Sequence, residues 1–241
     1  MKEVALQLYS IGGETASDFY GALCRTAEAG FTGVEFAGYG GNSAAQMKKW
    51  LDEWKLTPLS THTNVFENLD QQLEYLQALG VKNIVLPHAP FESEEQVLKL
   101  AESMNQIGEK CLSAGIQLSY HNHAHEFRKN DSGTWLLDIF YDHTDPKLVG
   151  MQLDVCWATV GGADPVAYLA KYRSRIHTVH MKEVLTISPY AGTAIGDGIV
   201  NFKGIYDLLG DSAAYIVEQE AISTMDTWTA LRKSVDYLKK L

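Results

Sequence analysis

The sequence predicts an α/β protein built as a single (β/α)8 barrel. Short apolar segments alternate with longer amphipathic segments along the chain, and this pattern occurs roughly eight times at intervals of about 30 residues. The apolar segments are continuous, which is typical of parallel strands buried on both faces. No linker or low-complexity segment interrupts the series, so we expect one domain over residues 1–241.

Each expected strand is followed by an expected helix. The strands are expected at residues 4–8, 33–36, 57–61, 83–86, 116–120, 148–153, 175–179 and 214–217. The helices are expected at residues 16–29, 43–54, 69–79, 93–114, 134–141, from 165 onwards, 202–209 and 227–238. Gly80 and Gly115 fit left-handed helix ends, and Asp164-Pro165 fits a helix start. The alternative is an open doubly wound sheet, but Ser10-Ile11-Gly12-Gly13 fits its glycine-rich first turn poorly.

The composition narrows the class of partner and the compartment. The formal net charge of −10 disfavours nucleic acid as a partner, because an acidic protein repels phosphates. Residues 1–13 hold one lysine and no long apolar run, so we expect no signal peptide, and we expect no membrane partner. Cys24, Cys111 and Cys156 are few and widely spaced, which fits reduced thiols in a cytoplasmic protein.

Most of the expected strands end in a side chain that can titrate or bind a metal. These side chains are Gln7 or Tyr9, Glu35, His62, His88, His121 with His123, Asp154, His180, and Glu218 with Glu220. A barrel forms its active site at the carboxyl ends of its strands, so we expect these residues to converge. A single strand-end histidine is more often a hydrogen-bonded structural residue, but this many in one chain favours a site.

Residues 118–127 concentrate this chemistry, with His121, His123 and His125 at alternate positions and Glu126 next to them. Alternate residues of a strand share a face, so His121 and His123 point into one space if the strand continues far enough. The alternative is a polar loop in which each histidine forms local hydrogen bonds.

Imidazole and carboxylate groups without a thiolate suit a divalent metal ion such as Mn, Zn, Co, Fe or Mg. A cation with open coordination positions can chelate a substrate carbonyl and its neighbouring hydroxyl. It then stabilises the charge that develops when the carbon between them loses a proton. A nearby glutamate or histidine could take and return that proton. Sugar isomerases, epimerases and dehydratases all use this chemistry.

Five segments resemble motifs of the sugar phosphate isomerase/epimerase family, the xylose-isomerase-like TIM barrels. They are YHNHAHEF at residues 120–127, LDVCW at 153–157, RIHTVHMKE at 175–183, GDGIVNF at 196–202 and YIVEQE at 215–220. The segments occur in the family's order and at its intervals over almost the whole chain. The resemblance implies a sugar or an inositol-like polyol as substrate and does not select one.

The resemblance implies that Asp154, His180 and Glu218 bind the metal, and that Glu218 also serves as a proton-transfer base. Many relatives carry a glutamate as fourth ligand at the end of strand five, where this chain has His121. Two alternatives follow. Either His121 is the ligand and a neighbour transfers the proton, or Glu126 reaches back into the site.

The remaining roles concern the substrate. Lys182 could polarise a substrate oxygen, or form a salt bridge to Glu183 or Glu220. Trp157 is interpreted as an apolar wall against a sugar ring, with a core tryptophan as the alternative. The catalytic residues expected are Glu218, His121 and Lys182, and the substrate-binding residues expected are His62, His88, His123, Glu126 and Trp157.

We therefore expect a metal-dependent sugar isomerase or epimerase acting on a free sugar, with a metal-dependent dehydratase or other lyase as the alternative. A non-catalytic sugar-binding barrel is disfavoured by the complete set Asp154, His180 and Glu218. The related AP endonucleases need a histidine where this chain has Trp157, and an Asp-x-His where it has Tyr190-Ala191-Gly192. A homo-oligomer is left open.

Overall fold

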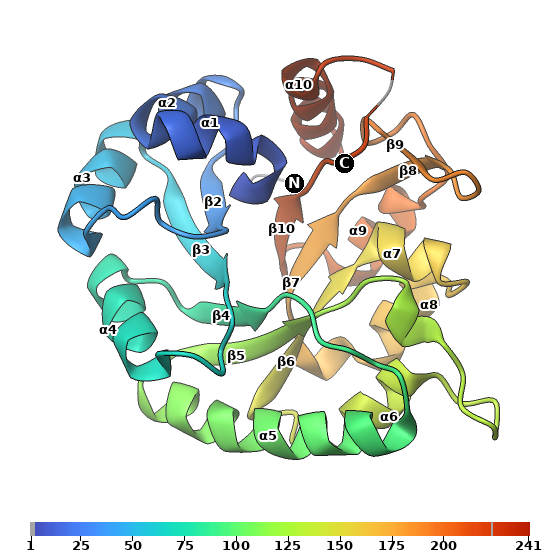
Figure 1. Cartoon of the computed structure of the whole chain (residues 1–241). Helices are drawn as coiled ribbons and strands as arrows, with labels where there is room; N and C mark the ends of the chain where they lie inside the picture. Colours follow the sequence, from blue (N-terminus) through green and yellow to red (C-terminus); the bar gives the residue numbers. More distant parts are fainter. Residues whose placement is uncertain (1–2, 223) are drawn as a thin grey trace.

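The computed structural model describes residues 3–222 and 224–241. Eight parallel strands form a closed barrel in the order β1-β10-β7-β6-β5-β4-β3-β2, which confirms the predicted (β/α)8 fold. Figure 1 shows the helices surrounding the strands. The strands are β1 (Val4–Gln7), β2 (Gly33–Phe36), β3 (Thr57–His62), β4 (Asn83–Leu86), β5 (Gln117–His121), β6 (Val149–Asp154), β7 (Ile176–Met181) and β10 (Ala214–Val217).

The helices lie between the strands along the chain, in the expected order. They are α1 (Gly12–Ser17), α2 (Phe19–Glu28), α3 (Ala44–Trp54), α4 (Leu69–Leu79), α5 (Glu94–Ser113), α6 (Leu136–Asp142), α7 (Val155–Val160), α8 (Pro165–Lys171), α9 (Phe202–Leu209) and α10 (Thr227–Leu238). Gly80 and Gly115 adopt the left-handed backbone, with φ of 81° and 73°, which explains why α4 and α5 end there. Among the described helices, none is both long and apolar enough to span a bilayer.

The expected single helix at residues 16–29 was wrong, because the chain forms two helices there. Asp18 separates α1 from α2 and has a non-helical backbone, with φ of −150°. Its Oδ1 accepts the backbone N–H of Gly21 at 2.9 Å and so caps α2. A capping aspartate satisfies the free N–H groups of a helix start, which favours a new helix over a continuous one.

Three further elements lie where the sequence predicted only loops. Helix α7 begins at Asp154, whose Oδ1 accepts the N–H of Trp157 at 2.8 Å. Strands β8 (Glu183–Thr186) and β9 (Ala191–Thr193) form a small antiparallel sheet outside the barrel. The buried Glu183 carboxylate anchors this sheet by accepting the N–H groups of Val184, Gly196 and Val200. Helix α7 spans less than two turns, and β8 and β9 are not continuous apolar segments, so they do not show the patterns that mark the other elements.

The strand register brings the polar strand ends into one layer. Glu35 is paired with Gln7 on one side and with Ser60 on the other. His121 is paired with Gln152, and Asp154 with His180. The register of a parallel sheet fixes which side chains meet, so it is the barrel itself that assembles these groups.

Aromatic packing behind β5 holds this strand in place. Tyr120 lies between Phe91 and Phe140, with ring centroids 5.5 and 5.0 Å away, and all three rings are fully buried. Burying a large apolar side chain contributes about 1.5–3 kcal/mol to folding. Since strand neighbours point to opposite faces, packing of Tyr120 against the helices directs His121 into the barrel.

Candidate active site and metal centre

A cavity of about 390 Å3 opens at the carboxyl ends of the strands. Cavities of this size hold small organic ligands. Its walls combine four histidines and two glutamates with a few other residues; the lining consists of Tyr9, Ala37, His62, Pro87, His88, His121, His123, Glu218 and Glu220. A larger hollow of about 750 Å3 lies at the amino ends of the strands, and its described lining holds no histidine. The cavity at the carboxyl ends is therefore the candidate active site.

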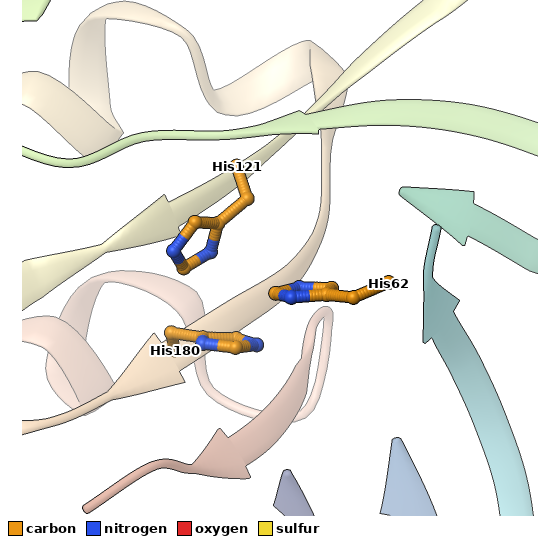
Figure 2. Close-up of side chains that lie close together, drawn as sticks. All are labelled: His62, His121 and His180. Carbon is orange, nitrogen blue, oxygen red and sulfur yellow. The ribbon is translucent and has the colours of Figure 1, made fainter. Parts of the chain in front are cut away.

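Four buried side chains meet at the base of this cavity, one each from β5, β6, β7 and the end of β10. His121, Asp154, His180 and Glu218 each offer a ligand atom, and these atoms lie within 4.8 Å of one another. His62 forms a second such group with His121 and His180. Figure 2 shows these three rings gathered around one space, and the rings of His62 and His180 are nearly parallel with centroids 5.1 Å apart. Two imidazoles and two carboxylates are a donor set for a divalent cation.

Asp154 provides the test of whether these residues fit a cation. Its Oδ1 accepts the N–H of Trp157, but its Oδ2 is buried without a hydrogen-bond partner. Burial raises the pKa of this carboxyl to about 7, against the opposing effect of the Lys182 ammonium. A buried carboxylate oxygen without a partner is costly, and a bound cation would remove that cost. The residues present therefore fit a divalent metal ion.

His180 lies between two carboxylates. Its Nδ1 is 2.8 Å from Glu218 Oε2, and its Nε2 is 2.5 Å from Glu35 Oε1. Burial lowers the pKa of His180, but the two carboxylates outweigh it and raise the pKa to about 10. Glu35 shows the matching effect, because His62 and His180 overcome its burial and lower its pKa to about 2. The ring is therefore held on both sides by strong charge-assisted hydrogen bonds.

Lys182 is buried and joins two of the glutamates. Its Nζ lies 3.1 Å from Glu218 Oε1 and 2.5 Å from Glu220 Oε1. Burial would lower the pKa of Lys182, but Glu218, Asp154 and Glu220 raise it above its ordinary value. Burial likewise would raise the pKa of Glu218, but Lys182 and His180 keep it well below its usual range. Both groups of this ion pair are thus charged at neutral pH.

The histidines that line the cavity are neutral at neutral pH. Burial lowers the pKa of His62, His88 and His121, and lowers that of His123 to about 4. The Nδ1 atom of His123 is buried without a hydrogen-bond partner. A neutral imidazole can donate one hydrogen bond and accept another, which suits the hydroxyl groups of a polyol.

Two of the expected substrate-binding residues lie outside the cavity lining. The Glu126 carboxylate is buried and accepts hydrogen bonds from the Tyr120 hydroxyl and the His123 N–H, both at 2.8 Å. It therefore orients the His123 backbone. Trp157 packs between Lys182, whose Nζ lies 4.7 Å from its ring centroid, and Tyr190, whose ring is 4.9 Å away. The structure brings His62, His88, His121 and His123 to the cavity.

Two residues that received no role from the sequence organise the base of the site. Glu35 was recognised only as a strand end, and Gln152 was not singled out. The Gln152 amide contacts Glu35 and Thr178 through Nε2, and His62 and His121 through Oε1. A polar residue inside an otherwise apolar strand was the available signal, since Gln152 lies two residues before Asp154 in MQLD.

The fold and this site place the chain in a known class of proteins. It belongs to the xylose isomerase-like TIM barrel family, whose model matches residues 23–241. This confirms the resemblance inferred from the sequence motifs.

Particular relatives lie on both sides of the isomerase–dehydratase division. A solved structure from Parabacteroides distasonis, described as a sugar phosphate isomerase/epimerase, is 30% identical with a TM-score of 0.83, over 99% of this chain and 93% of that one. A second, described alike and from the same organism, is 25% identical with a TM-score of 0.88, over 100% and 99% of the two chains. An inosose dehydratase of Bacillus cereus is 25% identical over 84% of this chain and 82% of its own.

Proposed function

We propose that this protein is a divalent-metal-dependent isomerase or epimerase of a sugar or related polyol, and that it removes a proton from the carbon beside a carbonyl group. The observation that carries the proposal is the unpaired, buried Oδ2 of Asp154 within the group formed with His121, His180 and Glu218. That group lies at the base of a cavity large enough for a small sugar.

His121, Asp154, His180 and Glu218 would hold the metal ion, with Mn, Zn, Co or Mg compatible with these donors. When bound, a divalent cation supplies charge stabilisation for the ene-diolate that forms when the substrate loses its proton. Each of the four side chains comes from a different barrel strand or strand end, so the fold holds the donors in place.

Glu218 is the group we propose as proton acceptor. It lines the cavity, and its pKa lies well below the ordinary value, so it is ionised. Lys182 donates a hydrogen bond to Glu218 Oε1, and His180 donates one to Glu218 Oε2. These two bonds fix the direction of the carboxylate. Because Lys182 is 1% exposed and bonds both carboxylates, we propose that it keeps Glu218 ionised and orients Glu218 and Glu220. A positioned base contributes a factor of about 10²–10⁴ to the rate.

We propose an uncharged sugar as substrate. The described lining of the cavity contains no arginine or lysine, and the nearby Lys182 charge is already bonded to two carboxylates. A phosphate group would face Glu218 and Glu220 without an arginine or lysine of the lining to pair with. His62, His88 and His123 are neutral and are placed to exchange hydrogen bonds with hydroxyl groups.

A dehydratase acting on a keto-polyol is the second candidate, and the inosose dehydratase relatives favour it. It would use the same proton abstraction and then expel the neighbouring hydroxyl group as water. The leaving hydroxyl must receive a proton, and the neutral rings of His88 and His123 are the donors at the cavity wall.

One experiment separates the two reactions. The protein is incubated with Mn2+ and a panel of free keto- and aldo-sugars and inosose-type polyols in D2O. Deuterium beside the carbonyl with an otherwise unchanged mass supports the isomerase or epimerase, whereas loss of water supports the dehydratase. If no panel member exchanges its proton or reacts, the proposed chemistry is contradicted.

We also propose a cytoplasmic location, since the structure contains free cysteines at positions 24, 111 and 156.

A further inference from the structure

Glu35 lies at the centre of the polar layer that closes the base of the active site. Its carboxylate is fully buried and receives hydrogen bonds from strands on several sides of the barrel. The contacts are Gln7 Nε2 at 2.7 Å, Ser60 Oγ at 2.5 Å, Gln152 Nε2 at 2.7 Å, His180 Nε2 at 2.5 Å and His62 Nε2 at 3.1 Å. An ionised carboxylate can only accept, so each partner must direct a hydrogen toward Glu35.

This requirement fixes the orientation of the Gln152 amide. Its NH2 group donates to Glu35 Oε2 and to Thr178 Oγ1 at 2.8 Å, which uses both of its hydrogens. Its Oε1 must therefore face the other way, toward His62 Nε2 at 2.6 Å and His121 Nδ1 at 3.0 Å. An amide oxygen only accepts, so His62 Nε2 and His121 Nδ1 each carry a hydrogen.

The position of the hydrogen on His121 has a direct chemical consequence. With the hydrogen on Nδ1, the lone pair of the neutral ring is on Nε2. Nε2 is then the nitrogen that His121 can offer to the group with Asp154, His180 and Glu218.

Glu35 fixes a ring hydrogen of His180 directly. Its Nε2 hydrogen points to Glu35 Oε1 and its Nδ1 hydrogen points to Glu218 Oε2, so Nδ1 is the nitrogen whose hydrogen a bound cation would replace. A histidine that donates one ring N–H to a carboxylate and offers its other nitrogen to a metal is a recurrent arrangement in metal sites.

We propose that Glu35 is a positioning residue that fixes the hydrogen on His180 directly and on His121 through Gln152, so that His180 Nδ1 and His121 Nε2 are the metal-binding nitrogens. The inference rests on the proposed function, because it assigns the ligand atoms of that metal site. Glu35 neither lines the cavity nor belongs to the groups of potential metal ligands among the described residues.

The substitution Glu35→Gln changes one oxygen to NH2 and conserves the shape. The new NH2 must face one of the two groups of donors that now surround the carboxylate. If it faces Gln152, that amide turns round and the hydrogen of His121 moves to Nε2. If it faces His180, Nε2 must accept and the remaining hydrogen occupies Nδ1. In either case one of the two metal-binding nitrogens carries a hydrogen and cannot offer its lone pair to the metal.

The test measures Mn2+ affinity by calorimetry and the imidazole nitrogens by long-range 1H–15N spectra of the metal-free protein. We expect the Kd for Mn2+ to rise about 10- to 100-fold in Glu35→Gln, as for other partners of metal-bound histidines. Glu183→Gln is the matched control, because Glu183 is also a buried carboxylate but bonds only backbone N–H groups. It should bind Mn2+ as the wild type does.

The spectra should show His121 with its hydrogen on Nδ1 in the wild type and a changed or mixed pattern in Glu35→Gln. Gln152→Met, which keeps the His180–Glu35 bond, provides a second variant if Glu35→Gln does not fold. It should lose the fixed Nδ1 hydrogen of His121 and bind Mn2+ more weakly.

A wild-type His121 with its hydrogen on Nε2, or unchanged Mn2+ affinity and spectra in the folded variants, would overturn the inference. A wild-type protein that binds no Mn2+ would instead contradict the proposed function, and the spectra would still decide whether Glu35 orders the histidines.

Discussion

The base and the wall of the active-site cavity are built differently. At the base, Glu35, Gln152, Asp154 and His180 are each 0% exposed and are held by hydrogen bonds from several strands. At the wall, His88 is exposed, and the nearby Tyr9 is 62% exposed. The base is therefore organised before any ligand arrives, whereas the wall retains free hydrogen-bonding capacity for a ligand. This difference indicates that the base determines cation binding and chemistry, and the wall determines substrate affinity.

The largest effect should follow from removing a group at the base. We expect His180→Ala to lose the metal and to lower kcat/KM at least about a thousandfold, because a bound cation supplies several kcal/mol of charge stabilisation. Metal content after dialysis and steady-state kinetics measure the two effects. His177→Ala is the matched control, since His177 lies on the same strand with an exposed side chain. Full metal content and activity in His180→Ala would contradict the assignment of the base.

Lys182→Met tests the ion pair that connects the base with the wall. The Lys182 ammonium lowers the pKa of Glu218, so its removal raises that pKa. Glu218 then becomes protonated at higher pH, and the acid limb of the kcat/KM profile should move to higher pH. At neutral pH we expect kcat to fall roughly ten- to a hundredfold. Lys203→Met, which removes an exposed lysine paired with Asp207, should leave the profile unchanged. An unmoved acid limb in Lys182→Met would show that Lys182 does not control the pKa of Glu218.

The smallest effect is expected at the wall. In His88→Ala we expect KM to rise about fivefold, corresponding to the loss of one hydrogen bond to the substrate of about 1 kcal/mol. The value of kcat and the Kd for Mn2+ should be unchanged, because His88 belongs to neither group of potential metal ligands in the described structure. A loss of Mn2+ affinity in this variant would remove the distinction between base and wall.

The sequence predicted the barrel well because its strands are continuous apolar segments that need no tertiary information. Strands β2, β4 and β10 lie at the expected residues. Most of the cavity histidines could also be found, because barrel topology requires strand ends to meet. Strands β8 and β9 could not be found, because they lie outside the barrel and are not the continuous apolar segments that mark its strands.

The hydrogen-bonding network at the base of the cavity could not be predicted from the sequence, for a different reason. The Gln152–Glu35 bond joins residues 117 positions apart, and it depends on the register around the whole barrel. The direction of the Glu126 carboxylate is decided by the 3₁₀ turn at His125–Phe127, which places it beside the Tyr120 hydroxyl. The sequence could name Glu126 and Glu35 as polar residues near the site but not their partners.

The central claim is that the four buried side chains at the base bind a divalent cation, and Asp154→Asn tests it most directly. Asp154 and Asp164 each begin a helix and each accept a backbone N–H through Oδ1, at 2.8 and 2.9 Å. Asparagine caps a helix as well as aspartate, so both helix starts should survive substitution. The two positions differ in that Oδ2 of Asp154 is buried without a partner.

The measurement is calorimetric titration of the metal-free proteins with Mn2+. We predict that Asp154→Asn weakens Mn2+ binding about a hundredfold or more, because replacing a ligand should cost at least as much as disturbing a residue that supports one. Asp164→Asn should bind as the wild type does. Wild-type affinity in Asp154→Asn would contradict the metal site and the mechanism built on it.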